Sequence, residues 1–299
     1  MRQSHPQTGL ETLCRLFGHS RQAYYSIQHT RKKDHLQEMF VLNLVEETRR
    51  EMTCKLGVRK LKVLLDQKLR AHGIQMGRDQ LFNLLRLYGL LLRKRRRKPK
   101  TTDSHHWLHK YPNLIKDLGV MEAHRLWVSD ITYIRLRLGF SYLSLITDAY
   151  SRKIVGHCLH PTLHTQGCEG ALILALGQWT SLGDWTLIHH SDKGTQYCSK
   201  QYVDTLMKRK IRISMGTGPS ENAIAERVNG TIKEEFRPGK VYDSYLDAKL
   251  DIDQIVRVYN ERRPHASIDY LTPDSAHNMQ GTLPKRWKAY PPKWRDRLA

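Results

Sequence analysis

The sequence of 299 residues lacks several features that define common classes of protein. It has no apolar run of about 18 residues, so no membrane-spanning helix is expected. Its first residues, MRQSHPQTGL, lack the apolar stretch of a signal peptide. Its five cysteines are an odd number and form no CxxC pair, which argues against a disulfide scaffold and against a cysteine zinc site. A reducing, cytoplasmic compartment is therefore expected.

Acidic residues are scarce, and the scarcity is uneven along the chain. Lys and Arg total 50 against 29 Asp and Glu, which leaves a net charge of +21. The first hundred residues carry 23 basic and 8 acidic residues, or +15, whereas residues 101–200 are nearly neutral at +1. With 39% hydrophobic residues the chain is not a disordered polycation. A basic front segment joined to a neutral middle indicates a polyanionic partner, with nucleic acid first and a membrane surface second.

The basic front segment has helical periodicity. Gly9 to Ile27 is typical of two short helices around a turn, either a helix-turn-helix unit or an ordinary helical hairpin. Three further helices are expected, over Leu42–Met52, Val58–Leu69 and Gly77–Leu91. In the last of these, Arg78 and Arg86 lie off the apolar stripe, where they suit DNA contacts or a solvated face.

Seven of the eight residues from Arg93 to Lys100 are basic. Charges of one sign at this density cannot enter a core, so the run is expected to be an exposed linker. Laid along a phosphate backbone it would release several counterions; otherwise it is a solvated linker without a ligand. DNA contacts are expected from six of its members: Arg93, Lys94, Arg95, Arg96, Arg97 and Lys98.

The middle of the chain has a different pattern, with β-branched and aromatic runs. Three strand-like runs at 126–135, 140–147 and 151–159 are joined by short turns, and helices then alternate with short strands up to a helix over 221–236. This order predicts an α/β fold with a mixed five-stranded sheet and flanking helices, preceded by an all-α region.

Three acidic residues stand out by their placement in this order. Asp130 lies inside an apolar strand, where a carboxylate is costly unless it is paired or binds a cation. Asp192 follows the fourth strand, at the end of an α/β sheet that usually carries the site, and Glu226 lies on the late helix. Converging, they would suit Mg²⁺ or Mn²⁺; taken singly, Asp130 could be a hydrogen-bonded strand residue and Glu226 a solvated one. Asp148 is a fourth candidate that looks more like a turn residue.

Several short segments around these acids occur in one order. They are WVSDITY around Asp130, TDAYSRKIVG from Thr147, HSDKGTQYCS around Asp192, ENAIAER around Glu226 and YNERRPH from Tyr259. Over about Leu126 to Pro273 this series resembles bacterial insertion-sequence transposases of the OrfB-like group, which have a retroviral-integrase-like Asp-Asp-Glu core. At the front end, LCRLFGHSRQAYY and GVRKL resemble the helix-turn-helix segments of the same family.

The resemblance implies a ribonuclease-H-like catalytic core in which Asp130, Asp192 and Glu226 hold two Mg²⁺ ions, with Mn²⁺ as a substitute. The implied enzyme cleaves at the inverted-repeat ends of an insertion sequence and joins them to target DNA, with no covalent enzyme intermediate. Its partner would be double-stranded DNA, bound by a homo-oligomer in the bacterial cytoplasm at the nucleoid. Whether an upstream reading frame supplies a partner protein or a fusion is left open.

The late helix carries further candidates and two departures from the family. Asn222, Asn229 and Lys233 share a helical face with Glu226, which suits DNA contacts near the metals. Only 33 residues separate Asp192 from Glu226, slightly fewer than in the family, and Glu221 is a rival third ligand. The shorter spacing motivates one alternative, an inactive relative that binds ends and represses; the other is a ribonuclease-H-like nuclease without joining activity.

The expected domain map follows from these segments. A helix-turn-helix-like segment spans 1–35, a helical DNA-binding domain 36–92, a basic linker 93–120, the catalytic core 121–280 and a basic tail 281–299. His105, His106 and His109 have no partner cysteines, so the zinc-binding front domain of retroviral integrases is not expected.

Overall fold

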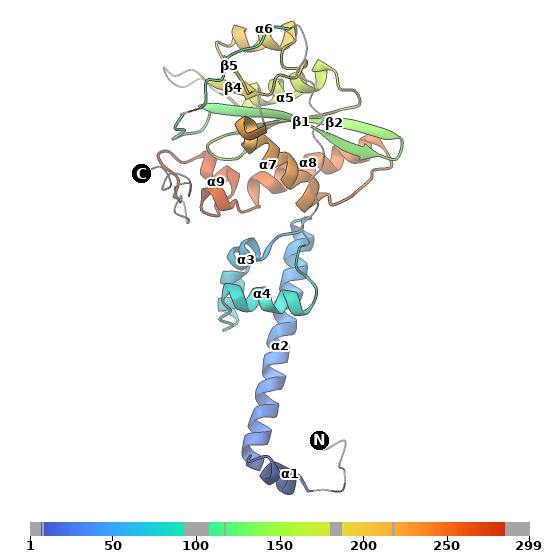
Figure 1. Ribbon diagram of the computed structural model, residues 1–299, viewed down its shortest axis with the longest axis vertical. Helices are drawn as coiled ribbons and strands as arrows, with labels where there is room; N and C mark the ends of the chain where they lie inside the picture. The colour runs from blue at the N-terminus through green and yellow to red at the C-terminus, as the bar shows by residue number, and fades with distance from the viewer. Residues whose placement is uncertain are drawn as a thin grey trace, which may run out of the picture. The chain divides into compact units, whose positions relative to one another are not determined.

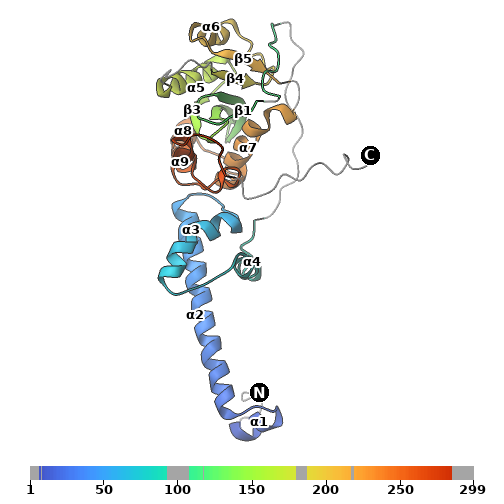
Figure 2. The same cartoon turned by 90° about the vertical axis from the view of Figure 1, so that its left-hand side faces the viewer.

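The computed structural model describes residues 7, 9–92, 108–116, 118–179, 187–216 and 219–284, without the side chains of 30–33, 219 and 220. The chain divides into two compact units: Met1–Glu51 with Gly57–Leu91, and Met52–Leu56 with Leu92–Ala299. The first unit is helical and the second is built on a sheet (Figure 1, Figure 2). None of the described helices combines the length and the apolar character that a bilayer crossing requires.

The helical unit contains α1 (Leu10–Leu16), α2 (Arg21–Glu51), α3 (Val58–Ala71) and α4 (Arg78–Leu87). The expected break between a helix ending near Ile27 and another beginning at Leu42 is wrong, because α2 is one continuous helix of 31 residues. Its sequence contains no glycine or proline, the two residues that would interrupt it. The expected boundary between residues 35 and 36 therefore falls inside α2.

The core of the helical unit forms where α2, α3 and α4 pack together. Leu61, Leu65 and Leu69 of α3 are buried at intervals of four residues, as expected of one helical face. Val63 lies off that face and is 38% exposed, because a residue two positions beyond Leu61 is more than half a turn away from it.

The second unit contains the sheet, with strand order β3-β2-β1-β4-β5. Its strands are β1 (Leu126–Leu136), β2 (Gly139–Asp148), β3 (Ile154–His160), β4 (Ile188–Ser191) and β5 (Arg212–Met215). Strands β1 to β3 pair antiparallel as a meander, whereas β4 pairs parallel with both β1 and β5. The expected mixed five-stranded sheet of a ribonuclease-H-like α/β fold is confirmed.

Helices cover both faces of this sheet (Figure 1). On one face α5 (Thr165–Gln178) and α6 (Lys200–Lys208) close a core around Trp127, which is fully buried. On the other face α7 (Ala223–Thr231) packs against β1, with Val128 and Ala225 in a smaller core. Successive residues of β1 therefore serve opposite cores, as the alternation of side chains along a strand requires.

The remaining elements surround α7 and complete its side of the sheet. They are the 3₁₀ turn η1 (Pro219–Asn222), the π-helical turn η2 (Ile232–Phe236), α8 (Tyr245–Glu261), the 3₁₀ turn η3 (Ala266–Ile268) and α9 (Pro273–His277). The single helix expected over 221–236 is thus three consecutive pieces: η1, α7 and η2. This division confines Glu226 to the first turn of α7.

Candidate active site

Asp130 lies on β1 and points to the side of the sheet that α7 covers. Its Oδ1 accepts a hydrogen bond of 2.9 Å from the backbone N–H of Ile131. Its Oδ2 accepts one of 2.7 Å from Nδ2 of Asn229, which α7 supplies. The carboxylate is therefore held by two donors from two elements, which fixes its orientation.

Asp192 directly follows β4 and reaches the same place through the strand register. The parallel pairing of β1 with β4 puts Val128 opposite His190. Two residues further along each strand, Asp130 and Asp192 come side by side. Oδ1 of Asp192 accepts a 3.0 Å hydrogen bond from the backbone N–H of Gly194, so the turn after β4 orients this carboxylate.

Electrostatics shows that Glu226 belongs to the same group. The pKa of Asp130 is raised from 3.8 to about 7, first by burial and next by the negative charge of Asp192, with a further contribution from Glu226. The hydrogen bond from Asn229 acts in the opposite direction. The three predicted acids therefore share one local field, although they come from β1, the end of β4 and α7.

Glu221, the rival third ligand, lies near His190. It belongs to η1 and its charge acts on His190. A Cβ added to Gly216 would lie 3.1 Å from Cβ of Glu221 and 3.2 Å from Nε2 of His190, which places these two side chains around the same glycine. The acids that raise the pKa of Asp130 are Asp192 and Glu226, so the structure favours Glu226.

The donor chemistry of the three acids fits a divalent cation. Among the described residues, no three His, Cys, Asp or Glu side chains lie close enough to cage an ion as they stand. Glu226 is exposed on the first turn of α7, so its side chain is free of packing that would prevent it from turning toward the two aspartates. A cation among three carboxylate oxygens would relieve the repulsion that raises the pKa of Asp130.

The two asparagines of the late helix make hydrogen bonds inside the protein. Asn222 and Asn229 are each only 6% exposed. Asn222 donates through Nδ2 to the backbone oxygen of Ser129, and Asn229 donates to Asp130. Both amides are turned into the protein and hold β1 in place, and a direct contact of either with DNA remains a prediction.

The other predicted DNA-binding residues remain predictions. Arg78 and Arg86 are exposed on α4, and the guanidinium of Arg78 pairs with its neighbour Asp79 at 2.7 Å. Lys233 is half-buried in η2. The basic residues 93–98 lie outside the described residues.

The two histidines before Asp192, His189 and His190, are buried and make hydrogen bonds inside the protein. Nε2 of His189 lies 3.0 Å from Oγ of Ser129 and 2.9 Å from the hydroxyl of Tyr202. Burial lowers the pKa of His189 to about 3, so the ring is neutral. His190 is also fully buried, with Nδ1 2.8 Å from Oγ of Ser214.

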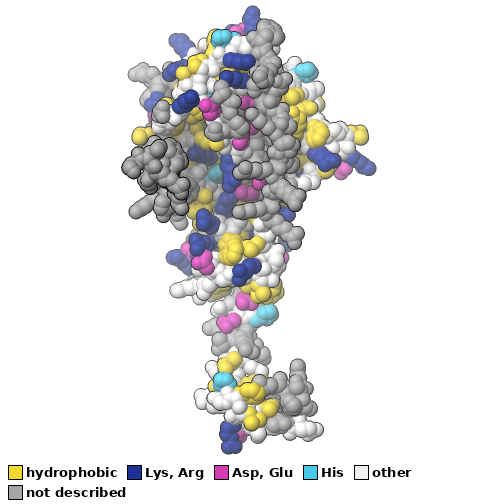
Figure 3. Space-filling model, viewed as in Figure 1, with side chains coloured by type: hydrophobic (Ala, Val, Ile, Leu, Met, Phe, Trp, Pro, Cys, Tyr) yellow, Lys and Arg dark blue, Asp and Glu magenta, His cyan; other side chains and the backbone are white. Residues whose placement is uncertain are grey.

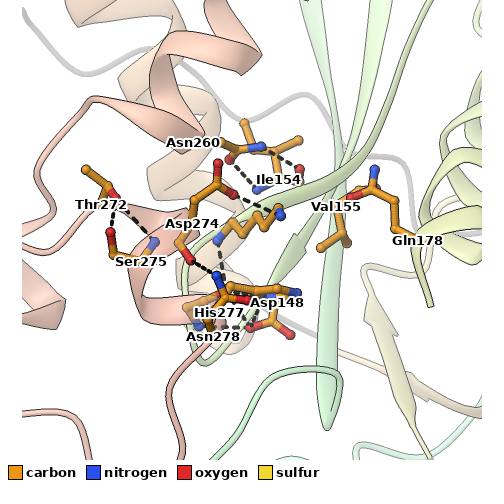
Figure 4. A network of polar contacts seen from close by, with 12 residues as sticks. Asp148, Ile154, Val155, Gln178, Asn260, Thr272, Asp274, Ser275, His277 and Asn278 are labelled. Carbon is orange, nitrogen blue, oxygen red and sulfur yellow. Dashed lines mark hydrogen bonds and ion pairs between the residues drawn. The ribbon is translucent and has the colours of Figure 1, made fainter. Parts of the chain in front are cut away.

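A polar network behind the site explains two of the motifs and was missed by sequence reasoning (Figure 4). Asp148 is fully buried and accepts hydrogen bonds from the backbone N–H groups of His124 and Ser151 and from Oγ of Ser151. Asn260 donates to the backbone oxygen of Ile154 and accepts from its N–H, both at 2.9 Å. The segments TDAYSRKIVG and YNERRPH therefore join the meander to α8 and α9 rather than performing chemistry.

Comparisons with known proteins agree with this geometry. Two models of the integrase core domain match, one over residues 121–218 and one over residues 208–273. An uncharacterized 31 kDa protein of insertion element IS600 from Shigella sonnei is 30% identical over 87% of this chain and 96% of its own length. The transposase for insertion sequence element IS629 from the same species is 31% identical over 74% of this chain and 73% of its own length.

Two further matches extend the comparison. Transposase InsF for insertion sequence IS3fB of Escherichia coli (strain K12) is 29% identical, covering 72% of this chain and 75% of its own length. Among solved structures, the HTLV-2 integrase catalytic core domain in complex with magnesium is 16% identical with a TM-score of 0.41, covering 54% of this chain and 100% of that one.

The five-stranded sheet, the integrase core matches and the transposase relatives define an Asp-Asp-Glu-type polynucleotidyl transferase with an integrase core. The chain belongs to the insertion-sequence transposases and is a DNA transposase. The two alternatives, a repressor without activity and a nuclease without joining, are not favoured. An integrase-like core implies dependence on a divalent metal.

Proposed function

We propose that this transposase uses Asp130, Asp192 and Glu226 as one metal-dependent site. At this site the enzyme would cleave at the inverted-repeat ends of an insertion sequence and then join those ends to target DNA. The observation that supports this proposal is the shifted pKa of Asp130, a strand carboxylate in the field of the other two acids. Such a cluster is unfavourable by itself and is typical of a cation site.

Two ions, Mg²⁺ or alternatively Mn²⁺, would neutralise charge on the attacking and leaving oxygens of the phosphodiester when bound. The protein's own contribution is to place their ligands. Asn229 and the N–H of Ile131 each hold one oxygen of Asp130, and the N–H of Gly194 holds Asp192. Ligands fixed before substrate arrives reduce the reorganisation needed in the transition state.

Most DNA contacts would come from the first hundred residues, which carry most of the chain's positive charge. The segments 1–35 and 36–92, with Arg78 and Arg86 exposed on α4, would grip the ends, and the basic residues 93–98 of the linker at 93–120 would add phosphate contacts. Lys233 would lie against DNA beside the core at 121–280, with the tail at 281–299 as a further contact. We propose a homo-oligomer on DNA at the nucleoid, as simultaneous engagement of two ends requires.

The test is an in vitro joining assay with a duplex that carries one inverted-repeat end, supplied both intact and pre-cleaved. Asp192→Asn and Glu226→Gln should each lower joining by at least about a hundredfold in Mg²⁺, because each removes a charged oxygen that no neighbour replaces. Glu221→Gln is the matched control on the same segment and should retain joining. Equal DNA affinity of all variants would show that their folds are intact.

Four outcomes would contradict the proposal. Undiminished joining by Asp192→Asn would exclude this acid, and loss in Glu221→Gln with retention in Glu226→Gln would reassign the third ligand. Cleaved products without any joined species, even from the pre-cleaved end, would identify a nuclease instead. Binding without cleavage by the wild-type protein would identify the repressor.

A further inference from the structure

The hairpin that joins β1 to β2 extends beyond the rest of the sheet (Figure 1). Strand β3 pairs with β2 no further than Tyr142, and β4 pairs only with the first three residues of β1. The last three pairs, from Ile134–Ser141 to Leu136–Gly139, thus form a two-stranded ribbon beyond β3 and β4. Residues 133–142 are called the hairpin tip below. Figure 3 shows hydrophobic and basic side chains together on this projection.

The two faces of the hairpin tip differ sharply in exposure. Ile134 and Ser141, on one face, are 5% and 0% exposed. On the other face Tyr133 is 37% and Phe140 52% exposed. The Tyr133 ring lies 5.2 Å from that of Tyr142 and 6.1 Å from that of Phe140, so three aromatic rings form one open surface.

The turn of the hairpin tip adds an isolated apolar side chain and two cations. Leu138 is 93% exposed, more than any other large hydrophobic residue in the described part of the chain. Arg135 and Arg137, both exposed, precede Leu138 in the sequence, and no Asp or Glu occurs between residues 131 and 147. The guanidinium of Arg137 approaches Asp243 only to 3.9 Å, and both side chains are solvated, so this pair is weak.

The hairpin tip is braced from one side. The backbone N–H of Arg137 donates to the backbone oxygen of Tyr242 at 2.8 Å. The backbone N–H of Tyr242 in turn donates to the backbone oxygen of Arg135 at 3.1 Å. The hydroxyl of Tyr242 donates to Asp251 of α8 at 2.6 Å. The exposed apolar and basic groups are therefore presented on a fixed support, which reduces the entropy lost on binding.

We propose that the hairpin tip is a DNA-contact element. Its chemistry is that of a ribbon that binds DNA independently of sequence: Arg135 and Arg137 pair with phosphates, while Leu138 and Phe140 lie against sugars and partly unstacked bases. Aromatic rings stack on any base, and exposed apolar side chains act as wedges at deformed base steps. Only the choice of DNA as the polyanion rests on the proposed function.

The test compares DNA affinity of the full-length protein and its variants by fluorescence anisotropy, at several salt concentrations and without divalent metal. The probes are a perfect duplex and the same duplex with a central mismatch. The double variant Arg135→Gln/Arg137→Gln should reduce the slope of log affinity against log salt by about 1.8, the value for two lost phosphate contacts. Leu138→Ser/Phe140→Ser should lose about tenfold in affinity for the mismatched duplex and less for the perfect one.

Matched controls come from the same unit. Lys208→Gln/Arg209→Gln removes two exposed charges near the end of α6, and Ile173→Ser removes an apolar side chain on α5 that is 66% exposed. Losses in the hairpin variants no larger than in these controls would overturn the proposal. So would a change of oligomeric state on size exclusion without a change in DNA affinity, because the surface would then bind a second copy. Joining by the wild-type protein is measured separately, so failure of the proposed function leaves this comparison decisive.

Discussion

Neutralising Asp130 should stabilise the metal-free protein while abolishing its activity. In Asp130→Asn the repulsion from Asp192 and Glu226 disappears, together with the cost of burying a charge. The hydrogen bonds can be kept: Oδ1 of Asn229 is buried without a partner, so this amide can rotate and accept from the new Nδ2. The variant therefore tests whether the site is a charge cluster awaiting a cation.

The size of the effect follows from the pKa of Asp130, which rises from 3.8 to about 7. A shift of about 3 units corresponds to about 4 kcal/mol as an upper limit. Since the side chain keeps some contact with solvent, a gain of about 1–3 kcal/mol is expected, or roughly 3–8 °C in the melting temperature of the catalytic unit. Asp130 binds its proton more tightly in the folded than in the unfolded protein. The free energy of unfolding of the wild type should therefore fall as pH rises from about 4 to about 7. Asp130→Asn should lack that fall.

The assay is thermal unfolding at pH 7.5 with and without Mg²⁺. Mg²⁺ should raise the melting temperature of the wild-type protein. Without metal, Asp130→Asn should melt at a higher temperature than the wild type, and Mg²⁺ should raise its melting temperature by less. Ser129 lies beside Asp130 on the opposite face of β1, so Ser129→Ala serves as a control that leaves the charges unchanged. A melting temperature of metal-free Asp130→Asn below that of the wild type, or an undiminished response to Mg²⁺, would refute the reasoning.

Two further outcomes are expected outside the site. Gly156→Ala would bring a Cβ within 2.1 Å of a backbone oxygen of α5, so it should destabilise the catalytic unit by about 3 kcal/mol or more. Gly177 has open space around it, so Gly177→Ala should be neutral or stabilising by about 0.5 kcal/mol. Chemical denaturation measures both changes. Burial lowers the pKa of His277 to about 4, so the stability that its neutral form contributes should be complete above pH 6.5 and lost as pH falls toward 4. His277→Gln should weaken this acid dependence; an unchanged profile would show that the ring is not part of it.

Sequence reasoning succeeded where local pattern and packing agreed. The meander was predicted from β-branched and aromatic runs, and so was the alternation of helices with short strands that follows it. It failed on α2, where two expected helices are one, and on the late helix, which is divided into three pieces. In both cases the error concerns where a helix is interrupted, a property that depends on neighbouring elements as well as on composition.

The same limit applied to the candidate site. Asp130, Asp192 and Glu226 were identified from their positions in the sequence, but their proximity was not contained in it. Asn229 was expected to contact DNA because helical spacing shows which face a residue shares without showing what that face meets. Packing of α7 on β1 turned that face inward, so that Asn229 holds Asp130.

The division of charge, the alternation of strands and helices and the choice of candidate acids could all be obtained from the sequence. Those properties are local, since they depend on residue type and on spacing within an element. That Asp130 lies in the field of acids 62 and 96 positions further along the chain follows from the tertiary structure. That required the parallel register of β1 with β4 and the docking of α7, both of which are long-range contacts. The cluster of like charges that results is unfavourable for folding, and the proposed binding of a cation would offset that cost.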